Sequence, residues 1–452
     1  MKMKKLLAIL LALVLVVALA ACGDTGSGGG NNNSGGGTSG GGNSSGGNSS
    51  GGGSSSGGVR LFNGKIEIAT AMEHAAAAYE EATGKHVEIE SLGGGVDLQA
   101  TLKQYYQAGN MPDIFVGEGQ TDFSNWTGMM VDLKDQPWMS DTDAAFVDDT
   151  GVTAGFPYTT EAIGLAYNVD ILEKAGVDVS AITGPAALRA AFETIDAKKD
   201  ELGLTAVVGY CAEAASLYWS TAQHVFGQYI DAGLARDDTT YIDLLLDGGK
   251  YDEPRLTHFA EMVGMLNEFS DPALLVSGNY DMQVQGFASG KYAFVTQGSW
   301  IGASLTDAYK SDYEAAGSFQ CGFIPYAFED GIDTILTNSP SWWAVYKDGN
   351  VDDALEFLNW LAGPDGQKIL VEEGGCVSPF KSCTAVANDP FAQAISDYTA
   401  AGKTSSWHWL DQPGNLAQDY TGILFQDYAS GNLATAADFV NALIQVTPQA
   451  FN

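Results

Sequence analysis

The chain has 452 residues and a formal net charge of −35, with 56 Asp and Glu residues against 21 Lys and Arg residues. This negative charge repels nucleic acid and anionic lipid surfaces, so neither is an expected partner. Arginine is scarce, and no arginine lies in a glycine-rich loop. Sites for phosphate or carboxylate ligands usually rely on arginine, so the composition favours a neutral or cationic ligand.

The first 21 residues have the layout of a secretory signal peptide. A short basic start precedes an apolar run from Leu6 to Leu19, and small residues follow before Cys22. The run of roughly 14 to 16 residues is shorter than the ~20 needed to span a bilayer. Leu19-Ala20-Ala21-Cys22 resembles a bacterial lipobox, which implies cleavage before Cys22 and lipid (palmitate) on that cysteine. The protein is therefore expected on the extracytoplasmic face of the cell membrane, anchored through Cys22.

Residues 22–58 comprise Cys22 and a tether that is almost wholly Gly, Ser, Asn and Thr. Such a segment has no apolar side chains whose burial could offset the entropy of ordering it. Random-coil scaling gives it an end-to-end distance of roughly 30–35 Å. The length of the remaining body suggests two domains, or one large bilobed domain.

The start of the body reads as alternating strands and helices. We predict strands at 66–70, 87–90 and 113–116, and helices at 72–83 and 98–109. This alternation is typical of a mostly parallel sheet, in which ligands bind beyond the carboxyl ends of the strands. The turn from Gly117 to Gln120 is therefore a candidate ligand site. Two further helices are expected at 352–361 and 365–373, separated by Gly363-Pro364.

Cysteine and histidine usage predicts no metal site and no cofactor. Cys211, Cys321, Cys376 and Cys383 show no CxxC spacing and have no histidine close by in the sequence. Cys376 and Cys383 could bridge a short loop or remain free thiols, and the sequence leaves both possibilities open. The five histidines form no metal or nucleophile pattern.

Four stretches of the body share an order with a known family. They include Gly109-Asn110-Met111-Pro112-Asp113, Pro157-Tyr158-Thr159-Thr160-Glu161, Gly290-Lys291-Tyr292-Ala293-Phe294 with Trp300, and 354–361 through 377–380. Together they resemble the sugar-binding, maltose-binding-protein-like branch of the bacterial extracellular solute-binding proteins of ABC importers. The resemblance implies an α/β, two-lobed periplasmic-binding-protein-like fold of type II, with hinge-connected discontinuous lobes. Matching segments assign 59–160 plus 330–380 to lobe one and 161–329 plus 384–452 to lobe two.

The resemblance also selects candidate ligand-binding residues. Sugars present polar edges and weakly apolar faces, so their pockets combine aromatic rings with a few polar side chains. Glu161 matches a position where maltose-binding protein uses an acid to bind sugar hydroxyls, although it could instead be a hinge carboxylate bonded to backbone. Glu118 and Gln120 lie on the strand-end turn. The aromatic candidates are Tyr218, Trp219, Trp300, Trp342, Trp407 and Trp409, with core packing the alternative for Trp300.

The expected function is therefore that of a monomeric, lipid-anchored receptor without catalytic activity. It would capture a carbohydrate, an oligosaccharide above all, between its lobes and deliver it to the transmembrane subunits of an ABC permease. A polyamine or other cationic or neutral solute is the alternative within the same class. A secreted glycan-active enzyme is a third hypothesis, with Glu118 and Glu161 as its pair of acids.

Overall fold

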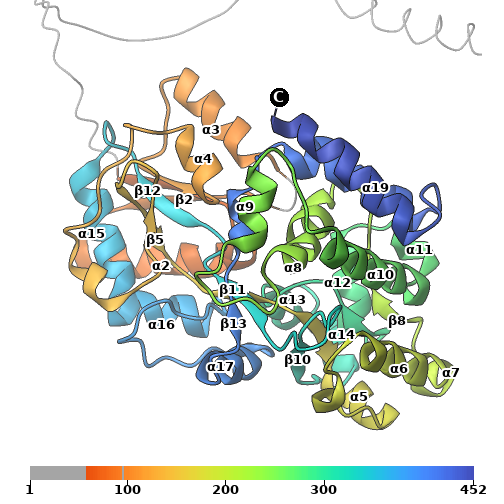
Figure 1. The fold of residues 1–452 in the computed structure, drawn as a ribbon. Coiled ribbons are helices and arrows are strands. Elements are labelled where there is room, and N and C mark those ends of the chain that lie inside the picture. Colours follow the sequence, from red (N-terminus) through yellow and green to blue (C-terminus); the bar gives the residue numbers. More distant parts are fainter. Residues whose placement is uncertain (1–57, 94–95, 452) are drawn as a thin grey trace, which may run out of the picture. The chain divides into compact units, whose positions relative to one another are not determined.

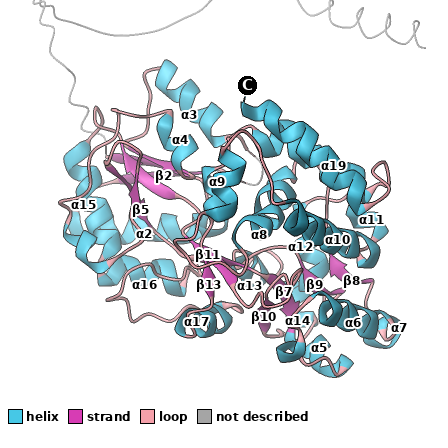
Figure 2. Ribbon diagram, in the orientation of Figure 1, coloured by secondary structure: helices cyan, strands magenta, loops and turns pink. Residues whose placement is uncertain are grey.

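The strands of the described part of the chain form three sheets that helices surround (Figures 1 and 2). The computed structural model describes residues 58–93 and 96–451. The predicted signal peptide, Cys22 and nearly all of the tether lie outside these described residues. Among the helices that the structure does describe, none is both long enough and apolar enough to cross a membrane.

Lobe one is the part of the body built on the six-stranded sheet, whose strand order is β2-β1-β3-β12-β5-β4. β1 pairs in parallel with β2 and β3, whereas β12 runs antiparallel to β3 and β5. Because β12 comes from a distant part of the chain, this lobe is discontinuous in sequence. Its strands are β1 (Val59–Asn63), β2 (Val87–Ser91), β3 (Ile114–Gly117), β4 (Phe146–Val147), β5 (Thr153–Pro157) and β12 (Trp342–Val345). Its helices are α2 (Ala69–Thr83), α3 (Leu98–Gln107), α4 (Gln120–Ser124), α15 (Val351–Ala362) and α16 (Pro364–Glu372).

Lobe two is built on the four-stranded sheet, in the order β10-β7-β9-β8. These strands are β7 (Leu165–Asn168), β8 (Ala206–Gly209), β9 (Tyr292–Val295) and β10 (Cys321–Ile324). The helices of this part of the chain are α5 (Val169–Ala175), α6 (Pro185–Asp196), α7 (Lys199–Leu202), α8 (Phe226–Asp231), α9 (Thr240–Leu246), α10 (Glu253–Phe269), α11 (Pro272–Leu275), α12 (Tyr280–Ala288), α13 (Ile301–Thr306), α14 (Lys310–Ala315), α17 (Ala392–Ala400), α18 (Gly422–Ala429) and α19 (Ala436–Val446). Two segments, η4 (Ser220–Val225) and η6 (Leu416–Thr421), are π-helical.

A small third sheet connects the two lobes, in the order β13-β11-β6. β11 (Ile335–Asn338) is antiparallel to β6 (Glu161–Ile163) and parallel to β13 (Thr404–Ser405). The chain passes from β5 of lobe one through β6 to β7 of lobe two, and returns from β10 through β11 to β12. The predicted two-lobed α/β fold with hinge-connected, discontinuous lobes is therefore confirmed. The residue boundaries assigned to the lobes remain a proposal.

Most elements predicted near the start of the body are present, but one strand is wrong. The predicted strand at 66–70 is instead the 3₁₀ segment η1 (Ile66–Ile68) followed by α2. The strand lies earlier, at β1, which has sheet neighbours on both sides. β1 was missed because a parallel strand that is covered on both faces lacks polar–apolar alternation. The alternation in Ile-Glu-Ile was misleading because it also fits a helical turn, in which Ile68 is buried and Ile66 is exposed.

The core of lobe one is packed with aromatic rings from neighbouring strands. Trp343 of β12 is fully buried, and its ring stacks on Tyr158 with a centroid distance of 4.2 Å. The cysteines of the described chain are all free, with Cys211, Cys321 and Cys376 buried and Cys383 partly exposed. The structure thus contains no bridge between Cys376 and Cys383.

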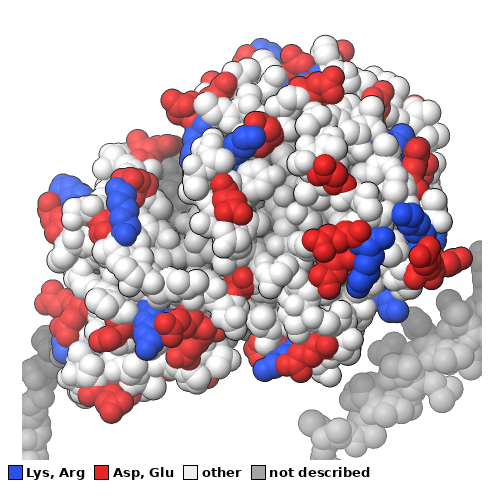
Figure 3. Space-filling view, turned by 90° about the horizontal axis from the view of Figure 1, so that it is seen from below, with Lys and Arg blue, Asp and Glu red and all other residues white. Residues whose placement is uncertain are grey.

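Charged side chains of both signs are scattered over the face shown in Figure 3, with wide uncharged areas between them. Basic side chains do not gather into a patch on this face. Nucleic-acid-binding surfaces need such a concentration of positive charge.

Candidate functional site

The carboxyl end of β3 presents Glu118 at the edge of the lobe-one sheet. Gly119 follows with φ +88°, a conformation that suits glycine, and α4 then begins at Gln120. The backbone N–H of Glu118 donates to Asp122 Oδ2 at 2.9 Å, while the Glu118 side chain is exposed. The side-chain Oε1 of Gln120 accepts a hydrogen bond from the backbone N–H of Asp149 at 3.1 Å. The predicted strand-end turn is therefore where the sequence placed it.

The charge on Glu118 is poorly compensated. Although Glu118 is exposed at the surface, the protein around it still withdraws water from its carboxylate, and Asp122 and Glu161 add negative charge. The pKa of Glu118 therefore rises to about 8, although Lys65 acts in the opposite direction. Burial likewise raises the pKa of Asp122 to about 6, against the hydrogen bond from the Glu118 backbone. Both carboxyl groups therefore ionise less readily than isolated, solvated acids.

Glu161, the first residue of hinge strand β6, forms a buried ion pair with Lys65. The Lys65 ammonium contacts Glu161 Oε1 directly and lies 3.9 Å from Glu67 Oε2. The side chains of Lys65 and Glu161 are only 12% and 7% exposed. Burial alone would lower the pKa of Lys65, but Glu161 and Glu67 raise it, so the lysine stays charged. Burial raises the pKa of Glu161, and Lys65 opposes that rise.

Four of the predicted aromatic residues gather around one histidine of lobe two. His224 lies 4.8 Å from Trp300, 5.1 Å from Trp409, 5.2 Å from Trp219 and 6.2 Å from Trp407, measured between ring centroids. Trp219 is half-buried, whereas the other three tryptophans are buried. We call these five residues the aromatic cluster. It joins the start of η4, the start of α13 and the segment η5 (His408–Asp411).

Tyr218 connects the aromatic cluster electrostatically to the acids of lobe one. It precedes Trp219 and is half-buried. Burial raises the pKa of its phenol, and Glu118 is the charged group that adds most to this rise, followed by Asp97 and Asp419. The phenol of lobe two therefore lies within electrostatic reach of the strand-end carboxylate of lobe one.

Trp342 lies apart from the aromatic cluster, in lobe one. It is the first residue of β12 and pairs with Gly117, so it is close to the strand end that presents Glu118. Its indole N–H donates to the Ala144 carbonyl at 2.7 Å, and its ring packs on Phe146 at 5.0 Å. Its role as a ligand-binding residue remains a prediction.

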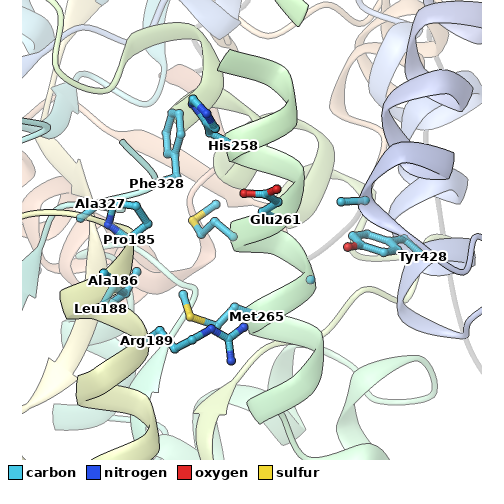
Figure 4. A pocket seen from close by; sticks show the side chains of 13 residues that line it. Pro185, Ala186, Leu188, Arg189, His258, Glu261, Met265, Ala327, Phe328 and Tyr428 are labelled. Carbon is cyan, nitrogen blue, oxygen red and sulfur yellow. The ribbon is translucent and has the colours of Figure 1, made fainter. Parts of the chain in front are cut away.

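Two cavities are relevant to where a solute could bind. Glu161 and Trp300 line the first, together with Lys65, Cys376 and Asp389, and its volume of about 20 Å³ suffices for about one water molecule. The second has a volume of about 530 Å³ and lies in lobe two, where side chains of α6 and α10 and Tyr428 of α18 face it (Figure 4). No predicted site residue and no lobe-one residue lines this second cavity. A site closed by movement of two lobes must touch both, so the larger cavity is not that site.

Sequence reasoning missed several residues of the site. Lys65, Glu67 and Asp122 were not singled out, and His224 was set aside with the other histidines. Lys65 and Glu161 are 96 positions apart in the chain, and only the fold pairs them. For His224 a weak signal existed, because it follows Tyr218-Trp219 closely in the sequence. No group of three or more His, Cys, Asp or Glu residues suitable for a metal occurs in the described part of the chain.

Comparison with known proteins decides the family. The family described as bacterial extracellular solute-binding protein matches residues 74–402. The chain belongs to this family. The resemblance found in the sequence is thereby confirmed, and the protein is an extracellular solute-binding protein.

Relatives of this solute-binding protein are sugar-binding proteins. The melibiose/raffinose/stachyose-binding protein MelE of Bacillus subtilis (strain 168) is 22% identical over 373 residues, covering 80% of this chain and 82% of MelE. A chitin oligosaccharide binding protein has the same fold, with a TM-score of 0.71, 18% identity and coverage of 87% and 98% of the two chains. A Bacillus licheniformis sugar transporter protein in complex with stachyose gives a TM-score of 0.65, 18% identity and coverage of 86% and 99%.

Proposed function

We propose that this protein captures a carbohydrate, an oligosaccharide above all, between its two lobes and delivers it to the transmembrane subunits of an ABC permease. The observation that carries the proposal is that the strand-end segment of lobe one meets the aromatic side of lobe two. The Thr121 hydroxyl donates to the Gln412 carbonyl at 3.3 Å, and the charge of Glu118 acts on Tyr218, which precedes Trp219 of the aromatic cluster. An aromatic face suits the apolar side of a sugar ring, and a carboxylate accepts hydrogen bonds from its hydroxyls. The names of the relatives favour the same ligand class.

Binding would act through lobe closure rather than chemistry. A ligand that contacts both lobes favours the closed arrangement by its differential affinity for that state. The crossings at β6 and β11 are the segments that would bend. The protein would act as a monomer, because each chain supplies both halves of the site.

Isothermal titration calorimetry with melibiose, raffinose, stachyose, chitotriose and spermidine tests this proposal. We expect at least one sugar to bind. In titrations above pH 8, where Glu118 is ionised, Glu118→Gln should weaken binding about tenfold because a neutral amide accepts weaker hydrogen bonds than a carboxylate. Glu88→Gln, an exposed acid on β2 of the same lobe, is the matched control and should leave the affinity unchanged.

The excess of acids at the site favours a cationic solute as the second candidate. Glu67 and Glu118 lie near Lys65, whose charge is already paired with Glu161, and Asp122 lies next to Glu118. Tight binding of spermidine, lost in Glu118→Gln, together with no binding of any sugar, would overturn the carbohydrate proposal. A hydrolytic role is tested in the same samples by mass spectrometry, since recovery of shorter sugars would contradict a receptor.

We also propose that lipid at Cys22 anchors the protein to the outer face of the membrane. The proposal rests on the lipobox-like sequence. In a bacterial host with a lipoprotein pathway, Cys22→Ala should move the protein from the membrane fraction to the soluble extracytoplasmic fraction. The control Cys383→Ala, a partly exposed thiol of the body, should stay with the membrane. An unlipidated Cys22 peptide in the mass spectrum of the wild type would contradict the anchor.

A further inference from the structure

His224 is surrounded by aromatic rings that come from separate parts of the chain. Trp219 precedes it in the same helical segment, Trp300 begins α13, and Trp407 and Trp409 belong to the η5 region. The centroid distances of 4.8 to 6.2 Å are those of direct ring contacts. The imidazole is therefore the central side chain of the aromatic cluster.

The hydrogen-bonding groups of the cluster divide into satisfied and unsatisfied ones. The Trp219 indole N–H donates to the Ser216 carbonyl at 3.0 Å, and that of Trp300 donates to Gln297 Oε1 at 3.1 Å. In contrast, His224 Nδ1 and the indole nitrogens of Trp407 and Trp409 are buried without a hydrogen-bond partner. Buried polar groups are nearly always paired, so these three atoms call for an explanation.

His224 also keeps contact with solvent. The residue is only half-buried, and its second ring nitrogen, Nε2, neither forms a hydrogen bond with a described residue nor belongs to the buried unpaired atoms. An accessible ring nitrogen thus lies among four tryptophans. The segment that carries it, η4, is π-helical, a conformation found often at functional sites.

The imidazole is neutral in this environment. Although one edge of His224 reaches solvent, the rings around the imidazole desolvate it and lower its pKa, and no charged residue contributes to that shift. The ionisable groups on the adjoining η5 segment are His408 and Asp411, and His408 is itself hydrogen-bonded to Asp231. A neutral imidazole has one nitrogen that donates and one that accepts. Such a group can bond a hydroxyl but offers no charge to an ionic ligand.

We propose that His224 is a specificity-determining residue, which hydrogen-bonds one hydroxyl of a neutral sugar through Nε2 while that sugar ring lies against Trp219, the one half-buried tryptophan of the aromatic cluster. This inference rests on the proposed function. The geometry supports a sugar hydroxyl because Nε2 is the ring nitrogen open to solvent and it is bordered by aromatic rings rather than by charged groups. A site that hydrogen-bonds a hydroxyl rejects analogues lacking it, since its own polar atom is then left unpaired.

The test pairs variants of His224 with analogues of the sugar. The probe is whichever of melibiose, raffinose, stachyose and chitotriose binds the wild type best, used with its set of monodeoxy analogues in calorimetric titrations. In the wild type, one monodeoxy analogue should bind about tenfold more weakly than the parent sugar. In His224→Phe the parent sugar should lose about tenfold, and the same analogue should bind as well as the parent. A packing role alone would lower all affinities equally.

His224→Gln keeps the experiment decisive if the phenylalanine variant does not fold, because it is smaller and retains a neutral hydrogen-bonding group. It should keep part of the discrimination between the parent sugar and the one analogue. His86→Phe, an exposed histidine of lobe one, is the control and should behave as the wild type. Unchanged discrimination in a folded His224 variant would overturn this inference while leaving the proposed function intact. Failure of every sugar to bind the wild type would overturn both.

Discussion

Replacing Lys65 by methionine is expected to lower the free energy of unfolding by about 3–5 kcal/mol at neutral pH. The reason is the burial of its partner, since the Glu161 side chain is only 7% exposed and contacts the Lys65 ammonium. Removal of the cation leaves a buried carboxylate with no compensating charge. Methionine keeps most of the side-chain volume, so a packing defect contributes little to the loss.

The loss should depend on pH in a defined direction. Burial raises the pKa of Glu161, and loss of Lys65 removes the group that opposes this rise. A carboxyl group with a raised pKa in the folded state binds a proton on folding, so the folded protein loses stability as pH rises from the unfolded value of about 4.3 to the raised value. The deficit of Lys65→Met should therefore be small near pH 4 and greatest above the raised pKa.

Urea unfolding followed by tryptophan fluorescence between pH 4 and 8 measures both effects. The double variant Lys65→Met/Glu161→Gln should recover much of the stability, because it removes the second charge as well. Lys368→Met is the matched control, since Lys368 is exposed and lies 4.0 Å from Glu372 within one helix, and it should cost at most about 0.5 kcal/mol. A Lys65→Met protein within about 1 kcal/mol of the wild type at pH 7 would contradict a stabilising role for the pair.

The sequence predicted the architecture better than the individual contacts. The helices around Met72 and Leu98 were found from their periodic apolar residues and their glycine stops, and Gly84 does end α2 with φ +75°. The central strand β1 was missed for a physical reason. Its sequence VRLFN has no alternation, because buried parallel strands need none.

The composition of the site could be anticipated only in part. Aromatic residues in loop-like contexts suggested Trp219, Trp300, Trp407 and Trp409 separately, and the fold brings them to one place. The sequence pointed to their common neighbour His224 less clearly than to the tryptophans. The environment of His224 depends on contacts with Trp407 and Trp409, which are almost two hundred positions away. The binding roles of these residues remain predictions that require ligand.

Replacing Trp219 by alanine is expected to weaken sugar binding by about tenfold to a hundredfold, or about 1.4–2.8 kcal/mol. Trp219 is half-buried and follows Tyr218 in the sequence. In binding sites a few residues carry most of the binding energy, and tryptophan is common among them. Its loss should lower the free energy of unfolding by less than the 3–5 kcal/mol typical of a fully buried tryptophan, because part of the Trp219 side chain is open to solvent.

Trp300→Ala should show the opposite balance. Trp300 is 7% exposed, and its ring packs on His224 within lobe two. Truncating so large a buried side chain typically costs 3–5 kcal/mol of stability. Its effect on affinity would therefore arise together with a loss of folding. Paired measurements of calorimetric affinity and urea unfolding distinguish the two tryptophans.

Trp360→Ala completes the comparison, because Trp360 is also half-buried but packs on Tyr79 in lobe one, away from the aromatic cluster. It should lose some stability and no affinity. If Trp219→Ala binds the sugar as tightly as Trp360→Ala does, the proposal that the aromatic cluster of lobe two contacts the sugar is wrong. If only Trp219→Ala loses affinity while remaining folded, ligand contact is the simplest cause, because a fault in folding or hinge geometry would also reduce stability.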